Sequence, residues 1–165
     1  MSKIKVQQPK LIHTPNIKRW ATTRATISQK IEELGLEPLY PGGVHQTYYF
    51  TDVDGCSKLL PNLILKSDLY KASIFSCINY AFKVWNECSE RYELNTWLPV
   101  IGRIPNYPVR HAWNLILLGD EGGIDLGLSL FFEPNDGWQM GTELENAYQA
   151  FPIGEEGYTG EKIFY

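Results

Sequence analysis

The order of predicted elements along the chain indicates an α+β fold, with helices early and antiparallel strands late. Two observations carry this prediction. Residues 73–94 (SIFSCINYAFKVWNECSERYEL) have the strongest helical pattern, because apolar side chains recur at every third or fourth position and Ser73 or Ser76 can cap the start. Residues 111–134 hold two strand-like runs around a Gly-rich turn, which is typical of a β-hairpin. We therefore expect a helix packed on an antiparallel β-sheet.

The other elements follow from local signals. Thr22 or Thr23 can cap a helix over residues 22–35, and Gly35 ends it. Residues 44–53 (VHQTYYFTDV) are mostly β-forming and predict a strand. The remaining expected elements are a short helix over 54–67 that Pro61 would interrupt, a strand and loop over 95–109, a strand over 111–119, a turn over 120–127, a returning strand over 128–134 and a short strand at 161–165.

The length and composition fit one globular domain. The chain has 165 residues, and we expect an irregular arm over 1–20 and a single domain over 21–165. The formal net charge is −4 and no dense Lys/Arg run occurs, which argues against a nucleic-acid binder. No apolar run reaches about 18 residues, and the first residues lack a hydrophobic secretory region. A cytoplasmic protein without a membrane span is therefore expected.

Three cysteines compete for the role of a nucleophile, since their spacing matches no zinc motif. Cys77 lies in the first turn of the 73–94 helix, where unpaired N–H groups and the helix dipole favour a thiolate. Cys88 lies deeper on the same helix face, and Cys56 lies in a Gly-containing turn, so neither has this advantage. Cys77 is the candidate nucleophile, although most cysteines are simply buried core residues.

Three histidines are candidates for the general base that would activate this thiol. His111 opens a predicted strand and shares one strand face with Trp113, which indicates a half-buried imidazole over an aromatic floor. His45 lies on another predicted strand and is the rival base, whereas His13 lies in the arm. A core histidine bonded to a backbone carbonyl is the alternative interpretation of His111.

Glu133 is the candidate that orients His111. It ends the returning strand of the hairpin among large apolar side chains, where an unpaired carboxylate is costly to bury. Pairing with an imidazole would offset that cost and fix its tautomer. Asp136 is the alternative acid, but its NDG sequence explains it as a turn residue. Since Trp138 follows the acid closely, we expect Trp113 and Trp138 to wall the site.

Three sequence blocks resemble a known family once these residues are placed in order. CINYAF (77–82), HAWN (111–114) and FFEPNDGW (131–138) are similar to blocks of a papain-like cysteine protease family. That family includes the C-terminal domain of the Marasmius oreades agglutinin, a mushroom lectin, and related phage and prokaryotic proteins. The similarity covers roughly residues 65–138. It implies a papain-like fold, which shares its order of Cys, His and acid with transglutaminase-like proteins.

Carried over to this chain, the resemblance implies Cys77 as nucleophile, His111 as general base and Glu133 as orienting acid. Asn114, in the HAWN block, is a candidate supporting residue or a replacement for the acid.

An oxyanion donor is also needed. Papain-like enzymes take it from a Gln shortly before the cysteine, and this chain has none there. The backbone N–H of Cys77 can serve, with Gln46 or Ser76 as the second donor. The residue after the Glu-Pro pair is often Gln in the family and is Asn135 here.

The leading hypothesis is a cysteine peptidase that attacks an amide or isopeptide carbonyl of a peptide or protein substrate. Peptidoglycan hydrolysis and acyl transfer to an amine use similar chemistry. The alternative from another class is a non-catalytic structural or interaction module, virion-associated if phage-derived. The residues predict no cofactor. Because the mushroom protease is calcium-dependent, the resemblance leaves calcium open, although Asp120, Glu121 and Asp125 form no calcium-loop pattern.

Overall fold

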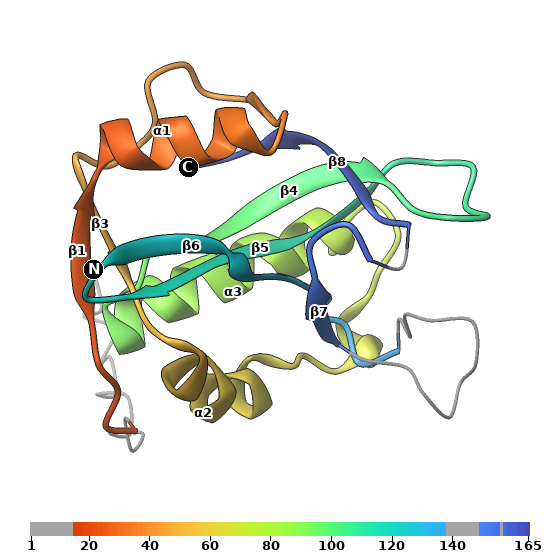
Figure 1. Ribbon diagram of the computed structural model, residues 1–165. Helices are drawn as coiled ribbons and strands as arrows, with labels where there is room; N and C mark the ends of the chain where they lie inside the picture. The colour runs from red at the N-terminus through yellow and green to blue at the C-terminus, as the bar shows by residue number, and fades with distance from the viewer. Residues whose placement is uncertain (1–14, 138–148, 156) are drawn as a thin grey trace, which may run out of the picture.

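The computed structural model describes residues 15–137, 149–155 and 157–165, and its centre is a six-stranded sheet (Figure 1). The strand order is β2–β8–β4–β5–β6–β7, and neighbouring strands are antiparallel except for β2 and β8. A separate antiparallel ribbon pairs β1 with β3. The strands are β1 (Trp20–Thr23), β2 (Glu37–Pro38), β3 (Thr47–Phe50), β4 (Trp97–Arg103), β5 (His111–Asp120), β6 (Gly123–Phe132), β7 (Ala150–Pro152) and β8 (Thr159–Ile163).

The two faces of the sheet bury separate apolar clusters. The helices are α1 (Arg24–Glu33), α2 (Val53–Leu63), the short 3-10 helix η1 (Ser67–Leu69) and α3 (Cys77–Tyr92). Helices α2 and α3 share one cluster with Ile116 and Leu118 of β5, whereas α1 and the ribbon share the other with Leu115 and Leu117. Side chains along β5 therefore alternate between the two clusters, as the sequence predicts. Figure 1 shows α1 and α2 on opposite sides of the sheet.

Of the two candidate capping serines, the second starts the helix that was expected within residues 73–94, and Cys77 begins it as predicted. Ser73 has a φ of 65°, in the left-handed region, so the chain turns tightly there instead of entering a helix. Ser76 is the N-cap, and the first helical residue is Cys77. The apolar stripe that follows is buried against the sheet, which is why this helix could be predicted most clearly.

The hairpin turn is much shorter than predicted. Strand β5 reaches Asp120 and β6 starts at Gly123, so the turn consists of Glu121 and Gly122 rather than residues 120–127. The Oδ1 atom of Asp120 accepts the Gly122 N–H at 2.7 Å, and Gly123 has a φ of 114°. These two features let the chain reverse in two residues, and the rest of the Gly-rich run continues as strand.

The elements near the N-terminus follow the prediction with shifted ends. The hydroxyl of Thr23 caps α1 by accepting a backbone N–H at 3.3 Å. The expected interruption at Pro61 is wrong, because Pro61 lies in the last turn of α2 and the helix continues through it. Trp20, the last residue of the expected arm, opens β1, and residues 1–14 of that arm lie outside the described residues. None of the helices in the described ranges is long and apolar enough to cross a lipid bilayer.

Candidate active site

The first turn of α3 places a cysteine at the positive end of the helix dipole. The N–H and the hydroxyl of Ser76 both donate to Asn79 Oδ1, at 2.9 and 3.2 Å. This cap fixes where the helix begins, and so it places the half-buried thiol of Cys77 in the first turn. The hydroxyl of Ser76 is engaged in the cap, which leaves it poorly placed as the oxyanion donor considered from the sequence.

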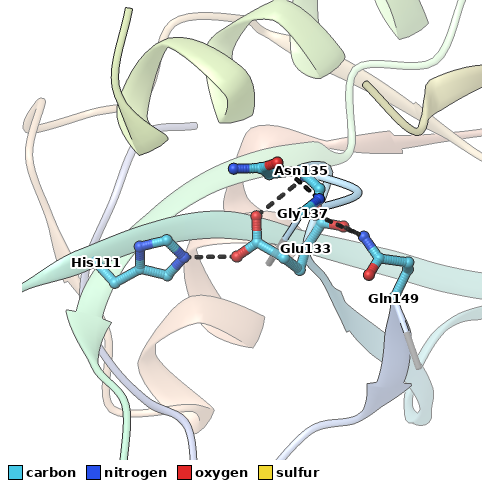
Figure 2. Close-up of polar contacts among 5 residues, drawn as sticks. All are labelled: His111, Glu133, Asn135, Gly137 and Gln149. Carbon is cyan, nitrogen blue, oxygen red and sulfur yellow. Dashed lines mark hydrogen bonds and ion pairs between the residues drawn. The ribbon is translucent and has the colours of Figure 1, made fainter. Parts of the chain in front are cut away.

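A histidine and a glutamate meet where β5 begins and β6 ends. The Nε2 atom of His111 lies 2.5 Å from Oε2 of Glu133, and the two side chains are 4% and 1% exposed (Figure 2). Strand register explains the contact. Asn114 pairs with Phe132, so Glu133, the residue after Phe132, lies on the same face of the sheet as His111. The structure thus brings together the two side chains that the sequence paired.

The thiol of Cys77 interacts with the same imidazole. Against the effect of burial, hydrogen bonding with His111, and with the backbone of Ala112 and Ile78, lowers the pKa of this thiol. Because Nε2 of His111 faces Glu133, Nδ1 is the ring nitrogen that remains for the thiol. Burial raises the pKa of the Cys77 thiol, but the hydrogen bond and charge of His111 outweigh burial and hold that pKa below its ordinary value.

The pKa of the His111 imidazole shifts in the opposite direction to that of the Cys77 thiol. Burial lowers the pKa of His111, but hydrogen bonds with Cys77 and Glu133, together with their charges, raise it to about 9. Burial raises the pKa of Glu133, against the lowering effect of its hydrogen bonds with His111 and Asn135. A lowered thiol pKa beside a raised imidazole pKa favours a thiolate–imidazolium pair near neutral pH.

The segment that carries Glu133 is held from both sides. The side-chain amide of Gln149 donates to the carbonyl oxygens of Glu133 and Asn135, at 2.7 and 3.0 Å (Figure 2). On the other side, the N–H of Leu65 donates to the carbonyl oxygen of Pro134 at 2.7 Å. Sequence reasoning missed Gln149, since a glutamine in a polar segment gives no signal before the pairing of β6 with β7 is known.

A cleft of about 490 Å³ opens over Cys77 and His111. Its walls come from the segment before α3, the β4–β5 loop and the segment after β6. The lining residues are Ser67, Tyr70, Cys77, Tyr107, Val109, Arg110, His111, Asn135 and Gly137. This volume is within the range of small-molecule and peptide-side-chain sites.

Two expected supporting residues lie behind the site rather than in it. Asn114 is fully buried, and its amide donates to the carbonyl oxygens of Ala81 and Trp97 at 3.0 Å each, which fastens α3 to the sheet. The ring centroid of Trp113 lies 6.2 Å from that of His111, with 25° between the planes. Trp113 is fully buried and backs the imidazole, which agrees with the expected aromatic floor, but it is not among the residues that line the cleft.

The other residues expected near the site are placed elsewhere. The Oδ1 atom of Asp136 accepts the Ser67 N–H at 2.6 Å, and the acid that meets His111 is Glu133. Gln46 is exposed in the loop before β3 and is absent from the described cleft lining, so the structure does not bring it to the thiol. Trp138 lies outside the described residues.

The rival base His45 and the rival thiols Cys56 and Cys88 are packed against other side chains. His45 packs edge-on against the rings of Tyr48 and Trp85, with centroid distances of 5.7 and 6.2 Å. Cys56 and Cys88 are buried in the cluster between α2, α3 and the sheet. Burial raises the pKa of Cys56 to about 12 and that of Cys88 well above its ordinary value, so both thiols stay protonated at neutral pH.

In the described ranges, no group of three or more His, Cys, Asp or Glu side chains is placed to hold a metal ion. Asp120 and Asp125 direct their Oδ1 atoms to the N–H groups of Gly122 and Gly127, at 2.7 and 2.8 Å. These bonds shape the turns of the β5–β6 hairpin.

Comparison with known proteins agrees with this architecture. No protein-family model matches the chain, and no curated protein matches it. A solved structure described as the PSL1a–E64 complex is similar, with a TM-score of 0.56 and 15% identity, over 88% of this chain and 51% of that one. The chain thus spans about half the length of that structure, in which E64 is a cysteine protease inhibitor. At this identity the similarity shows the fold alone: the chain has an α+β fold with a mainly antiparallel sheet, and the similar structure is consistent with a papain-like fold.

Proposed function

We propose that the chain is a cysteine-dependent hydrolase that attacks an amide or isopeptide carbonyl of a peptide or protein through an acyl-enzyme. The arrangement of Cys77, His111 and Glu133 carries the proposal. The thiol and the imidazole line the cleft, whereas the carboxylate behind them is buried. This is the order of contacts that a nucleophile, its base and an orienting acid require.

The reaction follows from the protonation states of these groups. The Cys77 thiolate attacks the carbonyl carbon, a C–S bond forms and the carbonyl oxygen becomes an oxyanion. The His111 imidazolium gives its Nδ1 proton to the leaving nitrogen, the C–N bond breaks and a thioester remains on Cys77. Neutral His111 then takes a proton from the attacking water, and release of the carboxylic acid restores the thiolate–imidazolium pair. Glu133 orients the ring and stabilises its charge in both steps.

The oxyanion has two candidate donors in this site. The N–H of Cys77 belongs to the first turn of α3, where backbone N–H groups have no intrahelical acceptor. The amide of Asn135 is the second candidate, since Asn135 lines the cleft and its Oδ1 accepts the Gly137 N–H at 3.0 Å. That bond leaves the Nδ2 group as a donor on the cleft wall. Asn135 replaces Gln46 and Ser76 in this role.

Two finer statements belong to the same proposal. The blocks CINYAF, HAWN and FFEPNDGW support a relation to the protease domain of the Marasmius oreades agglutinin. The binding of a cysteine protease inhibitor by the similar solved structure supports thiol chemistry in this fold. An amine in place of water in the second step would convert hydrolysis into acyl transfer.

Labelling with a peptidyl electrophile tests the proposal. We expect the reagent to modify Cys77 faster than Cys56 and Cys88 in the folded chain, as located by peptide mapping. Cys77→Ser should abolish the fast phase, and Cys56→Ala, the matched control, should preserve it. Equal and slow labelling of all three cysteines would instead favour the non-catalytic interaction module.

A further inference from the structure

One side chain in the cleft wall carries a permanent positive charge. Arg110 lies at the end of the β4–β5 loop, directly before His111, and lines the cleft with a side chain that is 57% exposed. The described cleft lining contains no carboxylate, although the whole chain has a formal net charge of −4. The charge of this wall is therefore opposite to that of the molecule.

A single carboxylate holds Arg110 in place. Glu161 of β8 contacts two arginines through their Nε atoms, with Arg110 at 2.7 Å from Oε2 and Arg103 at 2.8 Å from Oε1. Two guanidinium groups and one carboxylate leave one positive charge in excess. Arg110 contacts Glu161 through Nε, its guanidinium carries five N–H donors, and within the described residues no second carboxylate lies in ion-pair reach of it.

Carboxylates of the chain lie beside another wall of the cleft. Asp68 belongs to η1, next to the lining residue Ser67, and Asp136 lies between the lining residues Asn135 and Gly137. The N–H of Ser67 binds Asp136 at 2.6 Å, which keeps this carboxylate against the backbone. An acidic group of a substrate is repelled at that wall and attracted at Arg110, so the cleft has a defined electrical polarity.

We infer that Arg110 is a specificity residue that selects peptides with an acidic side chain beside the bond that is attacked. The inference rests on the proposed function, because it takes the cleft as the substrate site. A planar guanidinium held through Nε presents its Nη groups as a fork, which matches the two oxygens of an Asp or Glu carboxylate. The neighbouring lining residues Tyr70, Tyr107 and Val109 give the rest of the peptide apolar contact area.

Binding to the Cys77→Ala chain tests this inference without any turnover. Fluorescent peptides blocked at both ends are compared in matched pairs that differ by Glu against Gln at one position, scanned along the sequence. At one position we expect the Glu peptide to bind roughly three- to tenfold more tightly, the range of a solvent-accessible to partly desolvated charge contact. The preference should weaken at high salt.

Substitutions at Arg103 and Arg110, which share Glu161, distinguish selection of peptides by Arg110 from a general effect of positive charge. Arg110→Gln should remove the preference for Glu, and Arg110→Lys should retain part of it. Arg103→Gln is the matched control, because Arg103 contacts the same Glu161 but does not line the cleft, and it should keep the preference.

Equal binding of both peptide series, binding of neither, or a preference that survives Arg110→Gln would overturn the inference. Labelling of Cys77 by a peptidyl electrophile is an independent readout. Fast labelling without a Glu preference leaves the hydrolase proposal standing and removes this inference alone. A Glu preference without fast labelling would leave Arg110 as a carboxylate-binding residue of the cleft, and it would remove both the hydrolase proposal and the role of Arg110 in selecting the bond that is attacked.

Discussion

The Nε2 atom of His111 lies 2.5 Å from Oε2 of Glu133, and neither side chain is open to solvent. Water therefore screens this contact little, and each partner depends on the other for its charge. The same imidazole acts on the Cys77 thiol through hydrogen bonding and charge. A substitution at Glu133 is therefore expected to change the pKa of the Cys77 thiol, because His111 interacts with both residues.

Glu133→Gln should slow alkylation of Cys77. The carboxylate helps hold the pKa of His111 near 9, so its removal weakens the imidazolium and lowers the fraction of thiolate. We expect the rate at neutral pH to fall by about tenfold, which corresponds to one pKa unit. Asp136→Asn is the matched control, since Asp136 binds the Ser67 N–H and should leave the rate unchanged. Wild-type rates in Glu133→Gln at every pH would show that Glu133 has no orienting role.

The pH dependence of alkylation should reveal the lowered pKa of Cys77. Because that pKa lies below its ordinary value, the thiolate is already present at a pH where an ordinary thiol is protonated. The rate with iodoacetamide should therefore rise at lower pH than for a small-molecule thiol, with a second change as His111 loses its proton near pH 9. In His111→Ala, one rise at ordinary or higher pH is expected, and an unchanged profile would contradict the pairing.

Cys56 and Cys88 should be unreactive in the folded chain. Burial raises the pKa of Cys56 to about 12 and that of Cys88 well above its ordinary value. Timed alkylation followed by mass spectrometry should show modification of both residues only after denaturation. Modification of Cys88 at the rate of Cys77 would show that α3 is not packed as described.

Asn114→Ala should destabilise the fold without acting on the thiol directly. The change removes the two bonds that Asn114 donates to the carbonyl oxygens of Ala81 and Trp97. We expect the free energy of unfolding to fall by about 2 to 4 kcal/mol in urea titration. Asn86→Ala, at an exposed position of the same helix, should change it by less than about 0.5 kcal/mol. Similar losses for both variants would count against a role for Asn114 in fastening α3.

Asn135→Ala should slow acylation but not alkylation. An oxyanion forms when a peptide ester acylates Cys77 and does not form in the reaction with iodoacetamide, so only the first reaction needs the Asn135 donor. Loss of one oxyanion donor lowers acylation rates by roughly a hundredfold or more. Equal effects on both reactions would mean that Asn135 shapes the site through its bond to Gly137 instead.

The candidate triad could be predicted from the sequence because each member follows a local signal. Capping serines precede Cys77, a strand begins at His111, and Glu133 ends an apolar strand where a lone carboxylate is costly. Strand pairing then places the last two on one face, which depends on periodicity rather than on tertiary detail.

The remaining features depend on contacts between segments far apart in the sequence. Gln149 reaches Glu133 only because β7 pairs with β6, and Glu161 reaches Arg110 only because β8 pairs with β4. The turn of the hairpin was misplaced for a different reason. A run with several glycines predicts a loop, but the bond from the Gly122 N–H to Asp120 Oδ1 and the positive φ of Gly123 close the turn in two residues.

Trapping the acyl-enzyme tests the central claim most directly. The chain is mixed with an activated peptide ester, quenched in acid and measured by intact mass, and the modified residue is then mapped. We predict one added acyl group on Cys77, formed quickly in the wild-type chain, more slowly in Glu133→Gln and not at all in Cys77→Ser. An acyl group on another residue, or acylation of Cys77 that is unchanged in His111→Ala, would contradict the proposed chemistry.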